Sequence, residues 1–343
     1  MKNGVGSYWE ISNMWYWLIA SVLFVLYVYV GYPLVLYILT KGKSLPYPIG
    51  EYTGDISIVL VVCNEEAQIE NKLNNLFALE YLGGDKKVIV VDDASTDNTR
   101  HILEGYSENI TKIYIDKRSG KANGINLAMK EVSTELVLMV DCRQEIKSES
   151  LQYLSSWFQD SEYGAVSGDL MFKEIGSNNF SKGMDGYWKY EKFIRSRESI
   201  KSSVPGVTGA LYMLRSKAFE PLPIDTLLDD VQIPMIANKK GYRIGYDDRA
   251  IAWDEPSVSI EREKKRKIRT LSGNYQLLMR FISWILPFGH PIWWEFFSHK
   301  IARLLAPFVA IFSLIPSIFI ALEGSMLATA YIVLFTAGVF VLP

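Results

Sequence analysis

The stretch KVIVVDDASTDNT, residues 87–99, decides the fold. Residues 87–91 form a short apolar run rich in Val and Ile, which predicts a buried strand. Acidic and hydroxyl side chains follow at once, and a helical pattern covers residues 96–105. In open α/β sheets, ligands bind beyond the carboxyl ends of the strands. The polar residues after the run are therefore the first candidates for a binding site.

The same alternation continues on both sides of this stretch. Further strands are predicted at residues 56–63, 110–115, 136–140 and 165–167, and further helices at 66–79, 120–130 and 148–160. The alternation of strands and helices predicts an α/β domain over residues 54–270. Its mainly parallel sheet would be covered by helices on both faces.

Polar residues gather where three of these strands end. Asn64 and Glu65 follow the first strand, Asp92 and Asp93 the second, and Asp141 and Arg143 the fourth. Carboxylates that meet at one edge repel one another unless a cation or the donors of a ligand share the space. We therefore predict a site for a polar ligand that carries phosphate. Alternatively, some of the Asp, Ser and Asn residues here only cap the helices that follow.

The N-terminal part of the chain predicts a membrane anchor over residues 1–43. Residues 11–40 contain no charged side chain, and this run exceeds the ~20 apolar residues that cross a bilayer. The basic residues Lys41 and Lys43 follow the run, whereas a cleaved signal peptide carries basic residues before a shorter apolar core. A transmembrane helix is the favoured interpretation.

The C-terminal part predicts a transmembrane hairpin over residues 304–343. Two uncharged runs, 304–322 and 324–343, are separated by Glu323 and a Gly-Ser turn. Residues 271–303 are apolar but interrupted by Pro and Trp, which is typical of amphipathic helices at the membrane interface. The last predicted span ends at Pro343 without a polar tail, which indicates a shortened form of a longer protein.

The distribution of basic residues predicts the orientation in the membrane. Lys and Arg are dense before the hairpin, at 262–269, 280, 300 and 303. By the positive-inside rule, the middle of the chain lies in the cytoplasm and the N-terminus outside. We expect an integral protein of the cell membrane whose globular domain is cytoplasmic.

Composition excludes several functional classes. With 36 Lys and Arg against 38 Asp and Glu, the formal charge is −2, so the chain lacks the basic surplus of a nucleic-acid-binding protein. Two cysteines, Cys63 and Cys142, make neither a disulfide scaffold nor a zinc site. The three histidines are scattered and show no metal-ligand spacing.

Five short motifs occur along the chain: CNEE at 63–66, VDDASTD at 91–97, GKANGIN at 120–126, TGALY at 208–212 and LDDV at 228–231. Taken in this order, they resemble membrane-bound family-2 glycosyltransferases. The resemblance runs from about residue 55 to 276. This family includes cellulose and hyaluronan synthases and exopolysaccharide transferases, and it implies an inverting enzyme with the GT-A fold.

The resemblance also implies roles for residues that bind a nucleotide sugar. Asp92 or Asp93 would hold the uracil and ribose of a UDP-sugar, whose N–H and O–H groups suit a carboxylate acceptor. Asn64 and Glu65 belong to the same expected site. Arg118 and Lys121 lie where the family places a cation near the diphosphate; alternatively, Lys121 is a solvated lysine at a helix start.

The expected catalytic base is Asp230, with Asp229 before it. In the family, the last Asp of such a motif takes the proton from the acceptor hydroxyl. A neighbouring carboxylate and partial burial would raise its pKa and improve it as a base. Alternatively, both carboxylates only stabilise a helix N-terminus. Acceptor contacts are expected at Thr208, Gly209 and Ala210.

Two motifs depart from the family pattern. Arg143 replaces the second Asp of the usual Asp-x-Asp, so Mg²⁺ or Mn²⁺ would rely on Asp141, the diphosphate and water. The DCRQ sequence at 141–144 is similar to the Asp-Ala-Arg-Gln of related membrane transferases, so it does not indicate inactivity; Arg143 would itself neutralise phosphate.

The second departure is RKIRT at 266–270, which replaces the Gln-x-x-Arg-Trp of processive synthases. The missing Trp argues against processive synthesis. Arg266 and Arg269 are expected near the donor, where Arg269 would stabilise the leaving diphosphate. Alternatively, the whole basic run at 262–269 is a patch that attracts anionic lipid.

Together these features predict transfer of a sugar from a UDP-sugar to a lipid or glycan acceptor at the cytoplasmic membrane face, in polysaccharide or glycolipid synthesis. The alternative is a catalytically inactive sensor or assembly subunit that binds sugar nucleotides. Expected partners are the donor, the acceptor and membrane lipids. A homo-oligomer or a partner flippase is the expected route for the product.

Overall fold

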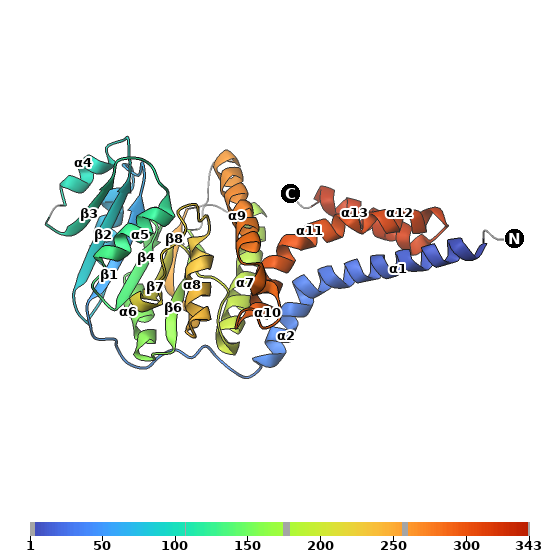
Figure 1. Ribbon diagram of the computed structural model, residues 1–343, viewed down its shortest axis with the longest axis horizontal. Helices are drawn as coiled ribbons and strands as arrows, with labels where there is room; N and C mark the ends of the chain where they lie inside the picture. Colours follow the sequence, from blue (N-terminus) through green and yellow to red (C-terminus); the bar gives the residue numbers. More distant parts are fainter. Residues whose placement is uncertain (1–3, 107, 174–178, 256–259, 342–343) are drawn as a thin grey trace. The chain divides into compact units, whose positions relative to one another are not determined.

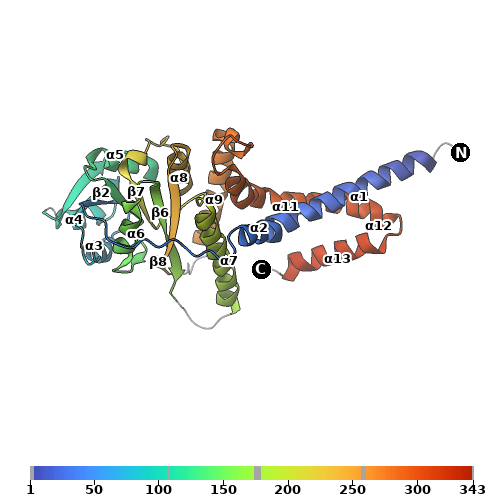
Figure 2. The ribbon, with the colours of Figure 1, turned by 90° about the horizontal axis from the view of Figure 1, so that it is seen from below.

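The computed structural model describes residues 4–106, 108–173, 179–255 and 260–341. The chain divides into two compact units (Figures 1 and 2). The larger unit is Leu39–Phe296, and the smaller combines Met1–Ile38 with Phe297–Pro343. Residues 342–343 of the last predicted span lie outside the described residues.

The larger unit is built on an eight-stranded sheet in the order β3-β2-β1-β4-β7-β6-β8-β5. Its strands are β1 (Ile56–Val62), β2 (Lys86–Asp93), β3 (Ile110–Ile115), β4 (Leu136–Val140), β5 (Glu145–Ile146), β6 (Tyr163–Phe172), β7 (Leu211–Arg215) and β8 (Arg243–Asp254). The pairs β1–β2, β1–β4, β2–β3 and β6–β8 are parallel, and β4–β7, β6–β7 and β5–β8 are antiparallel. The sheet is therefore mixed, with the predicted parallel part at β3-β2-β1-β4.

Helices cover both faces of the sheet (Figure 1), as predicted. Alternate residues of β1 enter different cores because a strand points successive side chains to opposite faces. Ile58 packs with α3 (Ile69–Phe77), α4 (Thr99–Glu104) and α6 (Ser150–Ser156). Val59 packs with α5 (Lys121–Glu131) and α8 (Asp229–Lys239) on the other face. Both faces of the strand are buried, which explains why its sequence is almost entirely apolar.

Two long helices complete this unit. Helix α7 spans Asn179–Lys201 and α9 spans Ile260–Arg280. The sequence placed a boundary at 270/271 between the globular domain and interfacial helices, whereas α9 runs through that position without a break. The short elements η4 (Ile282–Ile285) and α10 (Trp293–Phe296) follow it.

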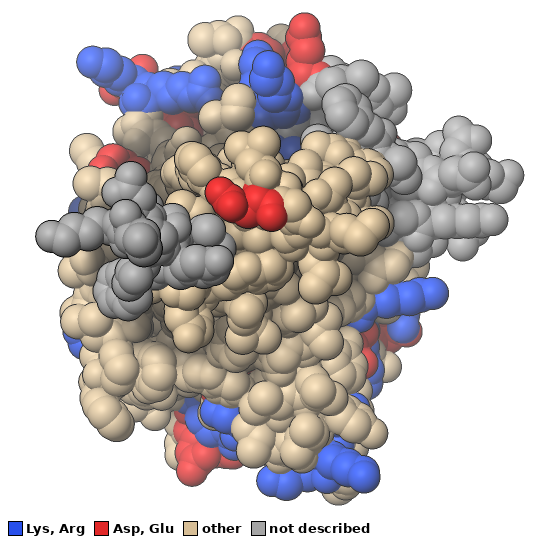
Figure 3. Space-filling model, turned by 90° about the vertical axis from the view of Figure 1, so that its right-hand side faces the viewer, with Lys and Arg blue, Asp and Glu red and all other residues tan. Residues whose placement is uncertain are grey.

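The smaller unit is helical and apolar. It contains α1 (Gly4–Leu26), the π-helical turn η1 (Tyr27–Gly31), most of α2 (Tyr32–Leu39), a second π-helical turn η5 (Phe297–Ile301), α11 (Ala302–Phe312), α12 (Leu314–Leu322) and α13 (Met326–Val341). Leu18 of α1 packs against Ile320 of α12 and Ala328 of α13. Many other apolar side chains are exposed, such as Leu23 at 59% and Leu322 at 79%. Figure 3 shows one face of the molecule on which uncharged residues form a broad area around a small acidic spot.

Two helical runs in the described residues are long and apolar enough to cross a membrane. They are Ser12–Leu39 and Trp293–Leu322, of 28 and 30 residues. The third predicted span corresponds to α13, whose apolar part, Met326–Ala337, is shorter. At 1.5 Å per residue, the 16 residues of α13 extend about 24 Å, which is less than the ~30 Å hydrocarbon core of a bilayer.

Candidate active site

The loops after β1 and β2 bind each other. Because β1, β2 and β4 are parallel, their carboxyl ends meet at one edge of the sheet. The Asn64 backbone N–H donates to Ser95 Oγ at 2.9 Å, and the Thr96 N–H donates to Asn64 Oδ1 at 2.8 Å. Asn64 has a φ of 57°, a left-handed conformation that Asn tolerates better than most residues. These hydrogen bonds join the two loops to each other at the edge of the sheet.

Asp92 and Asp93 are buried and have partners within the chain. Arg100 Nε donates to Asp92 Oδ2 at 3.0 Å. The backbone N–H groups of Ser119 and Gly120 donate to the two oxygens of Asp93 at 2.7 and 2.8 Å. Asp93 thus holds the turn that leads into α5, and a φ of 91° at Gly120 permits this turn. Neither Arg100 nor Ser119 was predicted to be a partner of these carboxylates.

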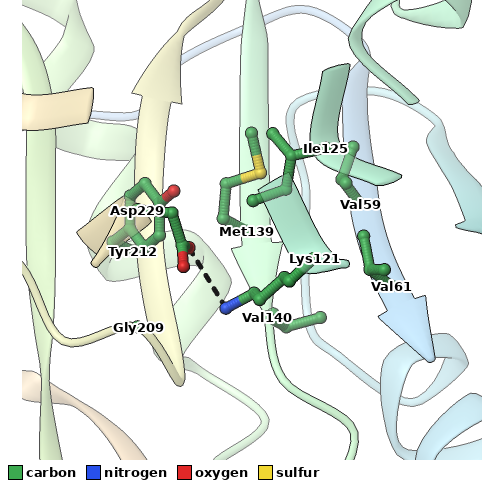
Figure 4. Close-up of a pocket in the computed structure, with 9 residues that line it drawn as sticks. All are labelled: Val59, Val61, Lys121, Ile125, Met139, Val140, Gly209, Tyr212 and Asp229. Carbon is green, nitrogen blue, oxygen red and sulfur yellow. Dashed lines mark ion pairs between the residues drawn. The ribbon is translucent and has the colours of Figure 1, made fainter. Parts of the chain in front are cut away.

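Lys121 connects two of the predicted acidic residues. Its Nζ lies 2.8 Å from Asp141 Oδ1. It also lies 3.2 Å from Asp229 Oδ2, the ion pair that Figure 4 marks. Lys121 comes from the first turn of α5, Asp141 from the end of β4 and Asp229 from the first turn of α8. Burial alone would lower the pKa of Lys121, but the carboxylates of Asp141 and Asp229 raise it well above its usual value. The ammonium group is therefore a permanent positive charge between the carboxylates.

A cavity of about 10 Å³ adjoins this ion pair, with Lys121, Tyr212 and Asp229 in its lining (Figure 4). The volume is that of about one water molecule. The Tyr212 hydroxyl and Asp229 Oδ2 are buried and have no hydrogen-bond partner among the residues that the structure describes. The 3.2 Å contact of Asp229 Oδ2 with Lys121 is ionic. Buried polar atoms are normally satisfied, so this spot suits a water molecule. Tyr212 belongs to the TGALY motif at 208–212, and it was not predicted to face the site.

Asp230 lies against the segment that was expected to bind the acceptor. The Val207 N–H donates to the Asp230 carbonyl at 2.8 Å. A Cβ added at Gly209 would lie 3.4 Å from Asp230 Cβ, so the Gly209 backbone faces this residue closely. Thr208 Oγ1 accepts a hydrogen bond from Arg195 Nη1 at 2.8 Å. Ala210 is buried in the core at 5% exposure.

Arg143 binds a buried carboxylate that the sequence analysis did not identify. Its Nη2 lies 2.6 Å from Asp254 Oδ2, and Gln144 Nε2 donates to the same oxygen at 3.0 Å. Asp254 ends β8 and is 2% exposed. Below the same turn, the buried Lys72 donates to the Gln144 carbonyl at 2.7 Å. Burial lowers the pKa of Lys72 to about 8.

Glu65 and Arg118 lie at the rim of the site. Burial raises the pKa of Glu65, the charge of Arg143 lowers it, and that of Asp141 raises it, so Glu65 lies near the turn after β4. Arg118 is exposed. Burial raises the pKa of the Cys63 thiol while the charge of Arg118 lowers it, which places Arg118 beside the end of β1.

Arg266 and Arg269 lie on α9. Both are exposed, and Arg269 Nη2 donates to the Leu227 carbonyl at 3.3 Å. Arg269 therefore contacts the segment that leads to Asp229 and Asp230.

The predicted metal ligand, Asp141, stands without other carboxylates in a metal-binding arrangement. In the part of the chain that the structure describes, no group of three or more His, Cys, Asp or Glu residues is placed to hold a metal ion. The Asp141 side chain is 40% exposed. One accessible carboxylate suffices for Mg²⁺ when substrate phosphates and water complete the shell.

Comparison with known proteins identifies the domain. The family description "Glycosyl transferase family 2" matches residues 57–222. The chain is 25% identical over 271 residues to "Poly-beta-1,6-N-acetyl-D-glucosamine synthase" of Staphylococcus aureus (strain COL), covering 77% of this chain and 63% of the relative. It is 24% identical over 231 residues to the protein of that name from Staphylococcus epidermidis, covering 66% and 56%. The chain thus spans less than two thirds of these relatives.

A solved structure shows the same fold. It is a mannosyltransferase from Pyrobaculum calidifontis in complex with GDP-Man and Mn²⁺, with a TM-score of 0.77 and 22% identity. The match covers 96% of this chain and 92% of the other. The GT-A fold expected from the motifs is thereby confirmed.

Proposed function

Because residues 57–222 form a domain of glycosyl transferase family 2, we propose that the chain is an inverting transferase that moves a sugar from a nucleoside diphosphate sugar to a lipid or glycan acceptor. The contacts of Lys121 carry the proposal. One ammonium group joins Asp141, at the donor edge of the sheet, to Asp229, which precedes the expected base. Donor phosphates and acceptor would therefore meet around one fixed positive charge.

The proposed reaction is a single displacement. The acceptor hydroxyl oxygen attacks the anomeric carbon while Asp230 takes its proton. The bond between that carbon and the diphosphate oxygen breaks, and its electron pair leaves with the nucleoside diphosphate. Lys121 and Arg143 stabilise the charge that develops on the diphosphate. The nucleoside would lie along Asn64, Glu65, Asp92, Asp93 and Arg118, and the acceptor beside residues 208–210.

A divalent cation is part of this proposal. Mg²⁺ or Mn²⁺ would be held by Asp141, diphosphate oxygens and water, and it would supply further charge neutralisation for the leaving group. The 40% exposure of Asp141 leaves it accessible to such an ion.

The relatives and the apolar helices support the proposed substrates and membrane setting. The staphylococcal relatives are named synthases of a poly-N-acetylglucosamine, which supports a UDP-sugar donor and an exopolysaccharide product. The runs Ser12–Leu39 and Trp293–Leu322 would anchor the chain in the cell membrane with the larger unit in the cytoplasm. An oligomer or a partner flippase would carry the product across.

The test is nucleotide release by the full chain in detergent with lipid extract. A panel of UDP- and GDP-sugars is offered with Mg²⁺, Mn²⁺ or EDTA. We expect release from one donor class with metal and its loss with EDTA. Nucleotide binding without release across the panel would favour the inactive sensor instead.

A further inference from the structure

Helix α9 forms several hydrogen bonds with residues 225–228, which precede Asp229 and Asp230. Gln276 Nε2 donates to the Asp225 carbonyl at 2.8 Å, and the Leu227 N–H donates to Gln276 Oε1 at 3.0 Å. Arg280 Nη2 lies 2.8 Å from both carboxylate oxygens of Asp225, and its Nη1 donates to Thr226 Oγ1 at 3.1 Å. We call this set of contacts between residues 225–228 and α9 the clasp.

Close packing continues the clasp at Leu228. A Cβ added at Gly273 would lie 2.5 Å from Leu228 Cγ, so only glycine allows α9 this near. The Leu228 carbonyl accepts from the N–H groups of Val231 and Gln232 at 3.3 and 3.0 Å, which begins α8. A shift of α9 would therefore move Leu228. Through these hydrogen bonds it would also move the first turn of α8, where Asp229 and Asp230 lie.

We propose that α9 is a positioning element for Asp230, and that Asp225, Gln276 and Arg280 set where the base stands. The proposal rests on the proposed function for the role of Asp230. The clasp contacts involve no residue of β1, β2 or β4, whose ends form the donor side of the site. Lys121 pairs with Asp229 of α8, but its shorter contact with Asp141, 2.8 against 3.2 Å, holds it at the donor side. Loosening the clasp should therefore misplace the base and leave donor binding intact. Misplacement of a reacting group by about 1 Å is enough to cost orders of magnitude in rate.

The variants are Asp225→Asn, Arg280→Gln and the charge swap Asp225→Arg with Arg280→Asp. The matched control is Glu220→Gln, which removes an ion pair of similar exposure with Lys240 at the other end of α8. We expect each single variant to lower kcat by on the order of tenfold, with donor KM unchanged. The swap should restore most of kcat, and the control should behave as wild type.

Gly273→Ala provides a second route to the same result. Alanine favours a helix more than glycine does, so α9 itself should form at least as well. Its new methyl group would displace Leu228, and we expect kcat to fall again with donor KM unchanged. A purely structural role would instead change thermal stability and leave the kinetic parameters of the folded protein unaltered.

Hydrogen exchange of the amides of residues 226–232 completes the test. We expect Asp225→Asn and Arg280→Gln to speed exchange in this segment and the swap to slow it again. Unchanged kcat in the single variants, a parallel rise in donor KM, or a swap no better than the single variants would overturn the proposal. If the wild-type chain releases no nucleotide from any donor, the proposed function fails, and unchanged exchange in Asp225→Asn would then overturn the clasp separately.

Discussion

Arg143 replaces the second Asp of the Asp-x-Asp pattern that the family resemblance predicts, and its contacts show why Asp would not serve at this position. The buried Asp254 depends on Arg143 and Gln144 for compensation. Arg143→Asp would place a second carboxylate against it. We expect a loss of about 1–3 kcal/mol in stability, moderated by the 45% exposure of Arg143, and no gain in activity.

Thermal unfolding and nucleotide release check this expectation. The double variant Arg143→Asp with Asp254→Asn should recover the stability, because the repulsion between the two carboxylates is removed. An Arg143→Asp chain that is as stable as wild type and more active with Mn²⁺ would contradict this account.

Lys72 lies under the same turn and gives a pH-dependent prediction. Its pKa falls from 10.5 to about 8 because burial penalises the charged form. Between these values the unfolded chain binds a proton that the native chain does not, so this group makes stability rise with pH. Lys72→Met should remove that rise, which amounts to about 3 kcal/mol at 1.36 kcal/mol per pKa unit.

The measurement is the difference in melting temperature between Lys72→Met and wild type at pH 7.5 and pH 10. The melting temperature of Lys72→Met minus that of wild type should be larger at pH 7.5 than at pH 10. Lys130→Met, at an exposed position of α5, is the control and should show no such change. A difference that stays constant with pH would refute the assignment.

Motifs predicted the residues that follow a strand or begin a helix. Lys121, Asp141 and Asp229 came from such motifs, and the structure brings them together. Asp254 and Lys72 were not predicted by any motif, because their partners Arg143 and Gln144 are 111 and 72 residues away in the chain. A contact of that kind depends on the sheet order, which local sequence does not contain.

Helix α5 lies unusually close to β1, and this closeness rests on one glycine. A Cβ added at Gly124 would lie 2.6 Å from Val61 Cγ1. We expect Gly124→Ala to cost about 1–3 kcal/mol through this clash, although alanine favours helices by about 1 kcal/mol. Thermal unfolding measures the net effect.

Gly186 of α7 supplies the matched control, because a Cβ there meets nothing within 4 Å. Gly186→Ala should therefore raise the melting temperature. Combining Gly124→Ala with Val61→Ala should recover part of the loss. Equal effects of alanine at both glycines would show that close packing of α5 does not matter.

Elements were predictable where burial made their sequence uniform. Strands β1, β2 and β4 were found because parallel strands that are buried on both faces form apolar runs. Strand β8 was missed because it contains Arg243, Asp247 and Arg249, which bind partners in other segments. The register shift between Ser167/Asp169 in the β6–β8 pairing also breaks the alternation.

The two units of the molecule predict a testable topology. Under the proposed orientation, the turn at Glu323 lies on the outer side of the membrane and Lys265 lies on the cytoplasmic side. Single cysteines at these exposed positions, in a Cys63→Ser background, can be labelled with an impermeant maleimide; Cys142 is buried. We expect Glu323→Cys to react in intact spheroplasts and Lys265→Cys only after permeabilisation. Labelling of Lys265→Cys in intact spheroplasts would contradict the orientation.

The central claim is that the chain transfers sugar and that Asp230 is the base. Its most direct test compares wild type with Asp230→Asn for transfer from the best donor of the panel and, separately, for donor binding by calorimetry. We predict that Asn, which cannot accept the proton, lowers transfer by at least about 10²-fold and leaves the donor Kd within a factor of two. Transfer at the wild-type rate by Asp230→Asn would contradict the account.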